Sequence, residues 1–88
     1  MPRFYFDVHD GTVTIDDEGT ELPDIDEARI QATKLAGILL SDNAEQFWNG
    51  EEWKVSVRDE NGVRLFSLLF VAMNTPVAPP PPALHARA

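Results

Sequence analysis

Cysteine is absent from this 88-residue chain, and histidine occurs only twice, as His9 and His85. The lack of cysteine excludes a disulfide framework, a thiol nucleophile and a thiolate zinc site. Two distant histidines without cysteine also argue against a transition-metal site. A chain of this composition suits a reducing compartment, and we expect it to be cytoplasmic.

Long apolar runs are also missing. The longest, from Leu68 to Met73, is far shorter than the roughly 20 residues needed to span a bilayer. The N-terminus has neither a basic start nor a long apolar stretch. We therefore expect neither a membrane-spanning protein nor one exported by a signal peptide.

Basic residues are scarce. The chain has 7 Lys and Arg against 15 Asp and Glu, for a net charge of -8, and up to Glu27 its single basic residue is Arg3. Such a surface repels a phosphate backbone, so nucleic-acid binding is not expected. The acidic surface either attracts a basic protein or a cation, or simply keeps the domain soluble.

Residues 3–9 alternate between apolar and polar side chains, as in a half-buried strand. The apolar side chains share one face. Asp10-Gly11 follows and is typical of a two-residue type I′ hairpin turn, because both residues tolerate positive φ. A turn at this place predicts the cross-strand pairs His9–Thr12, Val8–Val13 and Phe6–Ile15.

A second hairpin is predicted around Asn61-Gly62, the strongest short-range signal for this turn. Glu60 would then lie opposite Val63. Further out, the register aligns the apolar pairs Val57–Phe66, Val55–Leu68 and Trp53–Phe70. The reverse face carries the mixed pairs Arg58–Leu65, Ser56–Ser67 and Lys54–Leu69.

The segment between the hairpins predicts a helix. Asp24 is the expected N-cap, with Glu27 three residues later in a capping-box-like pattern. Apolar residues recur at helical spacing and form one stripe, whose members are Ile25, Ala28, Ala32, Leu35 and Leu39. The polar residues 41–43 end the helix, and residues 44–50 form a short turn or half-helix that closes one end of the core.

Together these elements predict an α+β domain over residues 1–72. Its sheet has four strands, built from two β-hairpins, and one helix packs on one face in the order ββαββ. Residues 73–88 include four consecutive prolines and predict a disordered or polyproline II tail.

No residue pattern in the chain predicts a catalytic site, a metal site or a cofactor. His9 with Asp7 on the same strand face is the one place where a general base and a carboxylate come together, but no nucleophile motif accompanies them. The acidic loop 16–18 lacks the ligand spacing of an EF-hand. Trp53 falls on the core face, whereas Trp48 either caps the core or lines the rim of a groove.

The outer face of the predicted sheet carries more apolar residues than we expect on a face in contact with solvent. One helix covers one side of a sheet, so the side chains on the other side need a different cover. We expect an interface there, formed by Tyr5, Asp7, His9, Leu65, Leu69 and Val71. A second copy of the chain, another protein or the tail itself would cover it, and an uncovered face is the plain alternative.

Three segments of the chain resemble a family of short alphaproteobacterial, largely rhizobial, proteins that is catalogued as a domain of unknown function. They are the opening MPRFYF, the stretch DDEGTELPD at 16–24 and the block FWNGEEW at 47–53. The likeness runs from Met1 to about Phe70 and leaves out the proline-rich tail. It implies a bacterial, cytoplasmic protein and carries no site residues with it.

The first functional hypothesis is a small acidic, non-enzymatic interaction module that forms a homodimer through the open sheet face or binds another protein. The second is a small-molecule or regulatory ligand site beside Trp48. The third is an enzyme that uses His9 with Asp7.

Overall fold

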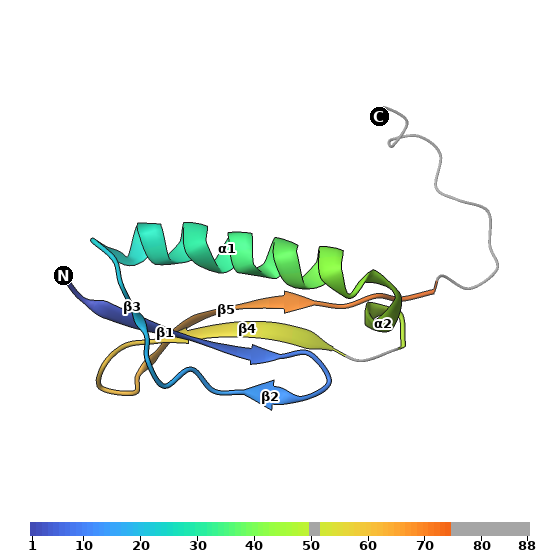
Figure 1. Cartoon of the computed structure of the whole chain (residues 1–88), viewed down its shortest axis with the longest axis horizontal. Helices are drawn as coiled ribbons and strands as arrows, with labels where there is room; N and C mark the ends of the chain where they lie inside the picture. The colour runs from blue at the N-terminus through green and yellow to red at the C-terminus, as the bar shows by residue number, and fades with distance from the viewer. Residues whose placement is uncertain (50–51, 75–88) are drawn as a thin grey trace, which may run out of the picture.

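The computed structural model describes residues 1–49 and 52–74. The chain folds as an antiparallel sheet with one long helix along one face (Figure 1). The elements follow in the order β1 (Arg3–His9), β2 (Val13–Thr14), β3 (Thr20–Glu21), α1 (Ile25–Asp42), α2 (Ala44–Phe47), β4 (Trp53–Arg58) and β5 (Arg64–Phe70). From residue 75 on, the predicted proline-rich tail lies outside the described residues.

The α+β class is confirmed, and the number of strands is corrected. The sheet has five strands in the order β2-β1-β4-β5, and β3 pairs with the other end of β1. The second arm of the first hairpin is thus divided into β2 and β3. The division occurs because the Asp16 Oδ2 accepts the Phe6 N–H at 3.1 Å, in the place where a strand carbonyl would otherwise lie.

The register of the first hairpin differs by one residue from the prediction. His9 pairs with Val13 and Val8 with Thr14, so the loop spans residues 10–12. Gly11 adopts φ 97°, and the Asp10 N–H bonds to the Thr12 carbonyl at 3.0 Å. Since cross-strand partners share a face, Val13 lies on the outer face of the sheet, where it is 64% exposed.

The second hairpin has the predicted pairs along most of its length. Trp53 pairs with Phe70, Val55 with Leu68 and Val57 with Phe66. The pairing differs from the prediction only next to the turn between β4 and β5.

At the end of this hairpin the turn contains three residues instead of two. Asp59, not Glu60, pairs with Val63, and Gly62 at φ 82° occupies the left-handed position after a type I turn. A register shift next to Arg58 then leaves Leu65 as an extra residue on β5. As a result Leu65 packs against the core, and not on the outer face as predicted.

Helix α1 begins as predicted. The Asp24 side chain accepts the Glu27 N–H at 2.9 Å and caps the helix. Ala28, Ala32 and Ala36 are buried against the sheet, and their small side chains allow a close approach of the helix.

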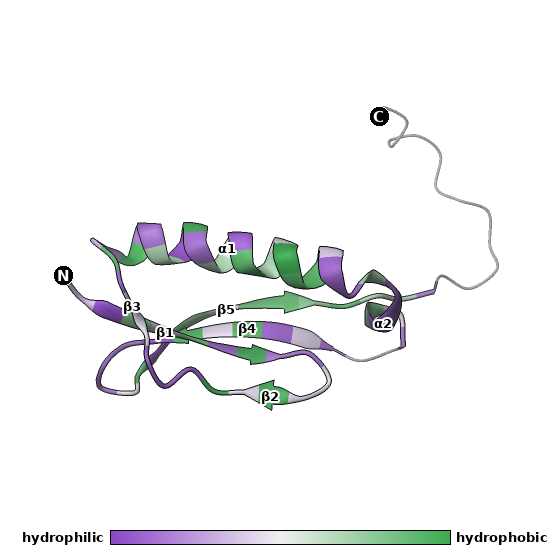
Figure 2. Ribbon diagram, viewed as in Figure 1, coloured by the Kyte–Doolittle hydropathy of each residue, from purple (hydrophilic) through white to green (hydrophobic). Residues whose placement is uncertain are grey.

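The core lies between α1 and the inner face of β1, β4 and β5. Val55 and Val57 of β4 are fully buried, and Phe66 packs against the same cluster. Figure 2 shows the apolar residues of β5 beneath α1, whose outward surface is largely polar. The predicted inner face is therefore confirmed for β1, for β4 and for Phe66, Leu68 and Phe70 of β5, whereas the assignments of Val13, Ile15 and Leu65 were wrong. Among the described residues, no helix is long and apolar enough to cross a bilayer.

Candidate functional site: an open sheet edge and a cavity beside the helix

The outer face of the sheet is held together by a polar network around Asp7. This side chain is only 7% exposed. Its carboxylate accepts the Arg58 Nε at 2.8 Å and Nη2 at 3.3 Å, and also the Asp16 N–H at 2.9 Å. The Arg58 guanidinium lies 4.7 Å from the centroid of the Tyr5 ring. Tyr5 and Asp7, two of the expected interface residues, are thus engaged within the domain.

Charge and hydrogen bonding favour the ionised form of both carboxylates in this network. Burial acts to raise the pKa of Asp7, but Arg58 and the Asp16 N–H more than offset it, so the pKa lies below 3.8. For Asp16, burial is likewise outweighed by the N–H groups of Gly19, Phe6 and Glu18, and the pKa is lowered from 3.8. Both groups therefore bind protons more weakly in the folded than in the unfolded chain.

This difference predicts acid sensitivity. The stabilisation is fully present above pH 3.8, the ordinary value, and is lost as the pH falls through the lower values of the folded state. We expect the free energy of unfolding, measured by urea titration, to drop between about pH 5 and pH 2.5. The Asp7→Asn variant should be less stable at neutral pH and show a smaller drop. An equal drop in both proteins would contradict the assignment.

His9 lies at the end of β1, between Val13 of β2 and Lys54 of β4. In the described part of the chain no hydrogen bond joins its imidazole to Asp7, whose oxygens are occupied by Arg58 and Asp16. The structure places the two residues on one face but does not pair them as a base and its orienting acid.

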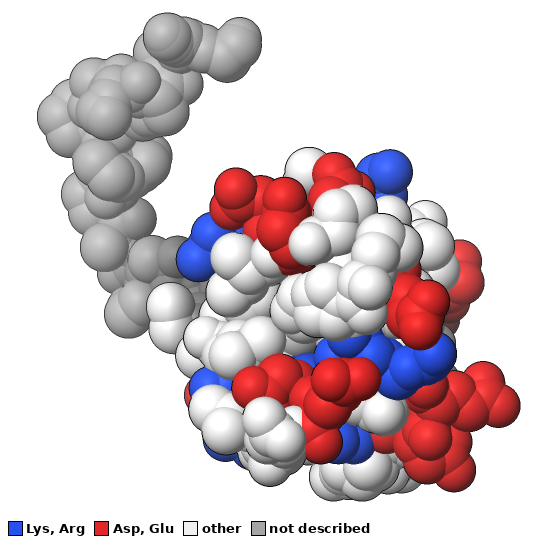
Figure 3. Space-filling model, turned by 90° about the vertical axis from the view of Figure 1, so that its left-hand side faces the viewer, with Lys and Arg blue, Asp and Glu red and all other residues white. Residues whose placement is uncertain are grey.

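The acidic loop 16–18 is a folded turn and not an open chelating site. The Asp16 Oδ1 accepts the N–H groups of Glu18 and Gly19, both at 3.0 Å. Residues 1–49 and 52–74 contain no cluster of acidic, histidine or cysteine side chains suited to a metal ion. Figure 3 shows acidic and basic side chains interleaved at the end of the molecule where α1 begins, and ion pairs such as Arg3–Glu21 account for part of this pattern.

Two of the expected interface residues, Leu69 and Val71, lie exposed at the β5 edge, whereas His9 is on β1 and Leu65 packs against the core. Leu69 is 57% exposed, and Val71, just beyond the strand, is half exposed. Val63, at the other end of β5, is exposed as well. The exposed apolar side chains thus lie toward the edges of the outer face and not in its middle, at the β5 edge and, with Val13 and Ile15, at the β2 edge.

Trp48, the expected rim of a ligand site, lies at the end of α2 and is 60% exposed. Its ring contacts Phe47 edge-on at 6.4 Å, and Phe47 in turn contacts Trp53 at 5.3 Å. Phe47 thus links the exposed tryptophan to the buried one.

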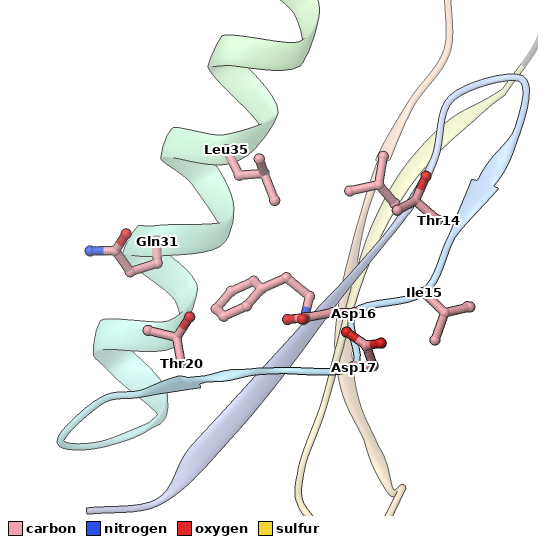
Figure 4. Close-up of a pocket in the computed structure, with 9 residues that line it drawn as sticks. Thr14, Ile15, Asp16, Asp17, Thr20, Gln31 and Leu35 are labelled. Atoms are coloured by element: carbon pink, nitrogen blue, oxygen red, sulfur yellow. The ribbon is translucent and has the colours of Figure 1, made fainter.

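A cavity of about 540 Å³ opens elsewhere, between α1 and the strands β1 and β2 (Figure 4). Trp48 does not line it. Its lining consists of Phe6, Val8, Thr14, Ile15, Asp16, Asp17, Thr20, Gln31 and Leu35. This cavity was not predicted from the sequence. The predicted elements did imply an uncovered region, because one helix roughly 10 Å wide cannot cover the inner face of four strands spaced about 4.8 Å apart.

Comparison with known protein families identifies a family for this chain. Residues 3–71 match the family described as domain of unknown function DUF6894. The chain belongs to this family. Neither the curated proteins nor the solved structures gave a match to the chain. Membership in DUF6894 confirms the resemblance noted from the sequence and assigns no activity, so the function of this domain is unknown.

Proposed function

We propose that this DUF6894 domain is a small non-enzymatic interaction module that pairs with a second copy of itself along the outer edge of β5. The observation that carries the proposal is the contrast between the two edges of the sheet. One edge is protected by the fold, and the other is open in the part of the chain that the structure describes.

The β1 edge is protected along its length. β3 pairs with Arg3 and Phe4, and β2 pairs with Val8 and His9. Between these two short strands, the Asp16 carboxylate accepts the Phe6 N–H. Few unpaired backbone N–H and C=O groups therefore remain on this edge for pairing with a strand of another molecule.

The β5 edge lacks such protection among the described residues, because β5 pairs with β4 on one side alone. It is seven residues long, and from Leu65 to Phe70 it contains neither a charged residue nor proline. Natural proteins usually shield edge strands with charges, prolines or very short lengths. An unshielded edge of this composition favours pairing with another strand.

A second copy of β5 fits this edge. In an antiparallel pair with a two-fold axis at Leu68, Phe66 of each copy lies opposite Phe70 of the other, and Ser67 opposite Leu69. The register opposes no like charges, and it joins apolar residues on the inner face. Cross-strand pairs of this kind contribute about 0.2 to 1 kcal/mol each, and a self-complementary strand gives a closed dimer.

Other occupants fit the edge less well. The proline-rich segment of the same chain has four consecutive prolines at 79–82, which lack the N–H groups that a strand partner must donate. A nucleic acid is disfavoured by the net charge of -8. We propose that the dimer forms in the cytoplasm, in keeping with the cysteine-free sequence.

Placing a charge on the β5 edge should dissociate the dimer. We expect Leu69→Lys to raise the dimer dissociation constant by about tenfold or more, because two like charges then approach within one interface. Leu69 is largely exposed, so the fold itself should tolerate the change. Sedimentation velocity over a concentration series measures the effect.

Val13→Lys is the matched control. Val13 is also an exposed apolar residue of the outer face, but it lies on β2 at the opposite edge. This variant should dimerise like the unmodified chain. A monomeric unmodified chain at high micromolar concentration, or equal effects of both lysines, would reject pairing along β5.

A further inference from the structure

The cavity beside α1 is a second feature that is independent of the β5 edge. α1 packs over β4 and β5, so it lies toward the β5 edge of the sheet and away from β2 at the opposite edge. Phe6 and Val8 of β1 consequently remain half-buried, although their partners on β4, Val57 and Val55, are fully buried. The volume of about 540 Å³ lies within the range typical of small-molecule sites.

The walls of this cavity are apolar on the inside and anionic at the margin. Phe6, Val8 and Leu35 supply apolar surface from β1 and α1, and Figure 4 shows Leu35 projecting from the helix toward the strands. Asp16 and Asp17 supply two carboxylates from the loop after β2. Among the residues that the structure describes, no lysine, arginine or histidine lines the cavity.

Asp16 is held rigidly at this margin. Three backbone N–H groups, from Phe6, Glu18 and Gly19, bond to its two oxygens at 3.0 to 3.1 Å. Its Oδ2 accepts one of these bonds, which leaves room for a further donor. Because this carboxylate is already fixed in place, little binding free energy is lost in ordering it when a ligand binds.

The charge balance next to the cavity is negative. Two basic side chains reach the loop that carries Asp16 and Asp17. Arg58 donates to the Asp16 carbonyl at 2.6 Å and pairs with Asp7 on the outer face, whereas Arg3 donates to the Glu18 carbonyl at 2.8 Å and pairs with Glu21. Each of these guanidinium groups is thus already paired with a carboxylate, Arg58 with Asp7 and Arg3 with Glu21. The Asp17 side chain makes no hydrogen bond to any described residue, and the loop also carries Asp16 and Glu18. Asp17 is thus available to a cation.

We propose that this cavity binds a small organic cation, an amine whose apolar body packs against Phe6 and Leu35 and whose ammonium group meets Asp17 and Asp16. An apolar wall selects for the body of the ligand, and the anionic margin selects for its charged end. An organic anion of the same size is repelled there. A bare metal ion would meet too few oxygen ligands beside an apolar wall.

Three probes that share one apolar body separate these contributions: phenethylamine, phenethyl alcohol and phenylacetate. Each is titrated into the full-length isotope-labelled chain, and binding is followed by amide chemical shifts. The amine should shift the amide signals of Phe6, Thr14, Asp16 and Leu35 saturably. The alcohol should bind the same place about tenfold more weakly, and the carboxylate more weakly still.

Asp17→Asn tests the charged end of the site. It should weaken amine binding by about tenfold and leave alcohol binding unchanged, since only the ion pair is removed. Glu45→Gln removes an exposed acid of α2 that lies outside the cavity, and it should change neither affinity. This control separates a local ion pair from the effect of net charge.

Each outcome decides the proposal. Saturable shifts at the cavity with the order amine, alcohol, carboxylate support it. Equal binding of amine and carboxylate, shifts at another surface, no binding up to the solubility limit, or equal effects of Asp17→Asn and Glu45→Gln overturn it.

Discussion

Replacing Trp53 with alanine should lower the free energy of unfolding by about 4 kcal/mol, the largest effect we expect from one substitution. Trp53 is the first residue of β4 and is only 4% exposed. It pairs with Phe70 and contacts Phe47 edge-on at 5.3 Å. The truncation removes a large apolar side chain and leaves a cavity at this end of the core. Because small domains have a total stability of about 5 to 15 kcal/mol, the variant should be close to unfolding.

Trp48→Ala is the matched control, since Trp48 is the other tryptophan and is 60% exposed. It should cost about 1 kcal/mol or less. Urea titrations followed by circular dichroism measure both variants without relying on tryptophan fluorescence. Similar losses in the free energy of unfolding for the two variants would contradict the placement of Trp53 in the core.

The second large effect concerns the polar network on the outer face. Asp7→Ala should lower the free energy of unfolding by about 2 kcal/mol. The substitution removes the acceptor of both Arg58 nitrogens and of the Asp16 N–H. The loop after β2 then loses one of its attachments to β1. The expected loss is below that of a fully buried ion pair, because the Arg58 side chain is partly in contact with solvent.

Asp26→Ala tests whether ion pairing alone explains that loss. Asp26 bonds to Arg29 at 2.8 Å, the same distance as in the Asp7–Arg58 pair, but both side chains are exposed on α1. Exposed pairs contribute about 0 to 1 kcal/mol. If Asp26→Ala costs as much as Asp7→Ala, the burial and backbone contacts of Asp7 have no special importance.

Local patterns predicted much of this fold. The pairs between β4 and β5 follow from alternation and from a turn near Asn61-Gly62, and the start of α1 follows from its cap at Asp24. These features depend on residues that are close in the sequence or on strict period-two alternation. Such signals are strong because a one-residue slip would turn every apolar side chain of the strand to the wrong face.

The errors arose where side chains compete with the backbone ladder. Asp10-Gly11 suits both a two-residue and a three-residue loop, and the side-chain bond from the Thr12 hydroxyl to Asp10 accompanies the longer one. Asp16 interrupts the second strand by accepting the Phe6 N–H. The extra residue at Leu65 turns a predicted outer side chain toward the core. None of these contacts has a periodic signature.

The candidate site was harder to predict because it depends on distant contacts. Asp7 and Arg58 are 51 residues apart in the sequence, so their pairing became visible only in the folded chain. It removes Tyr5 and Asp7 from the expected interface and leaves Leu69 and Val71 at the β5 edge. The cavity likewise depends on where α1 crosses the sheet, which sequence periodicity does not specify.

Cross-linking through one introduced cysteine tests pairing along β5 most directly. The chain has no cysteine of its own, so a Leu69→Cys variant carries a single thiol. With a short bifunctional maleimide, we predict efficient formation of a covalent dimer, whereas Val13→Cys at the opposite edge should stay monomeric. A cross-linked dimer from Val13→Cys and none from Leu69→Cys would contradict the proposed interface.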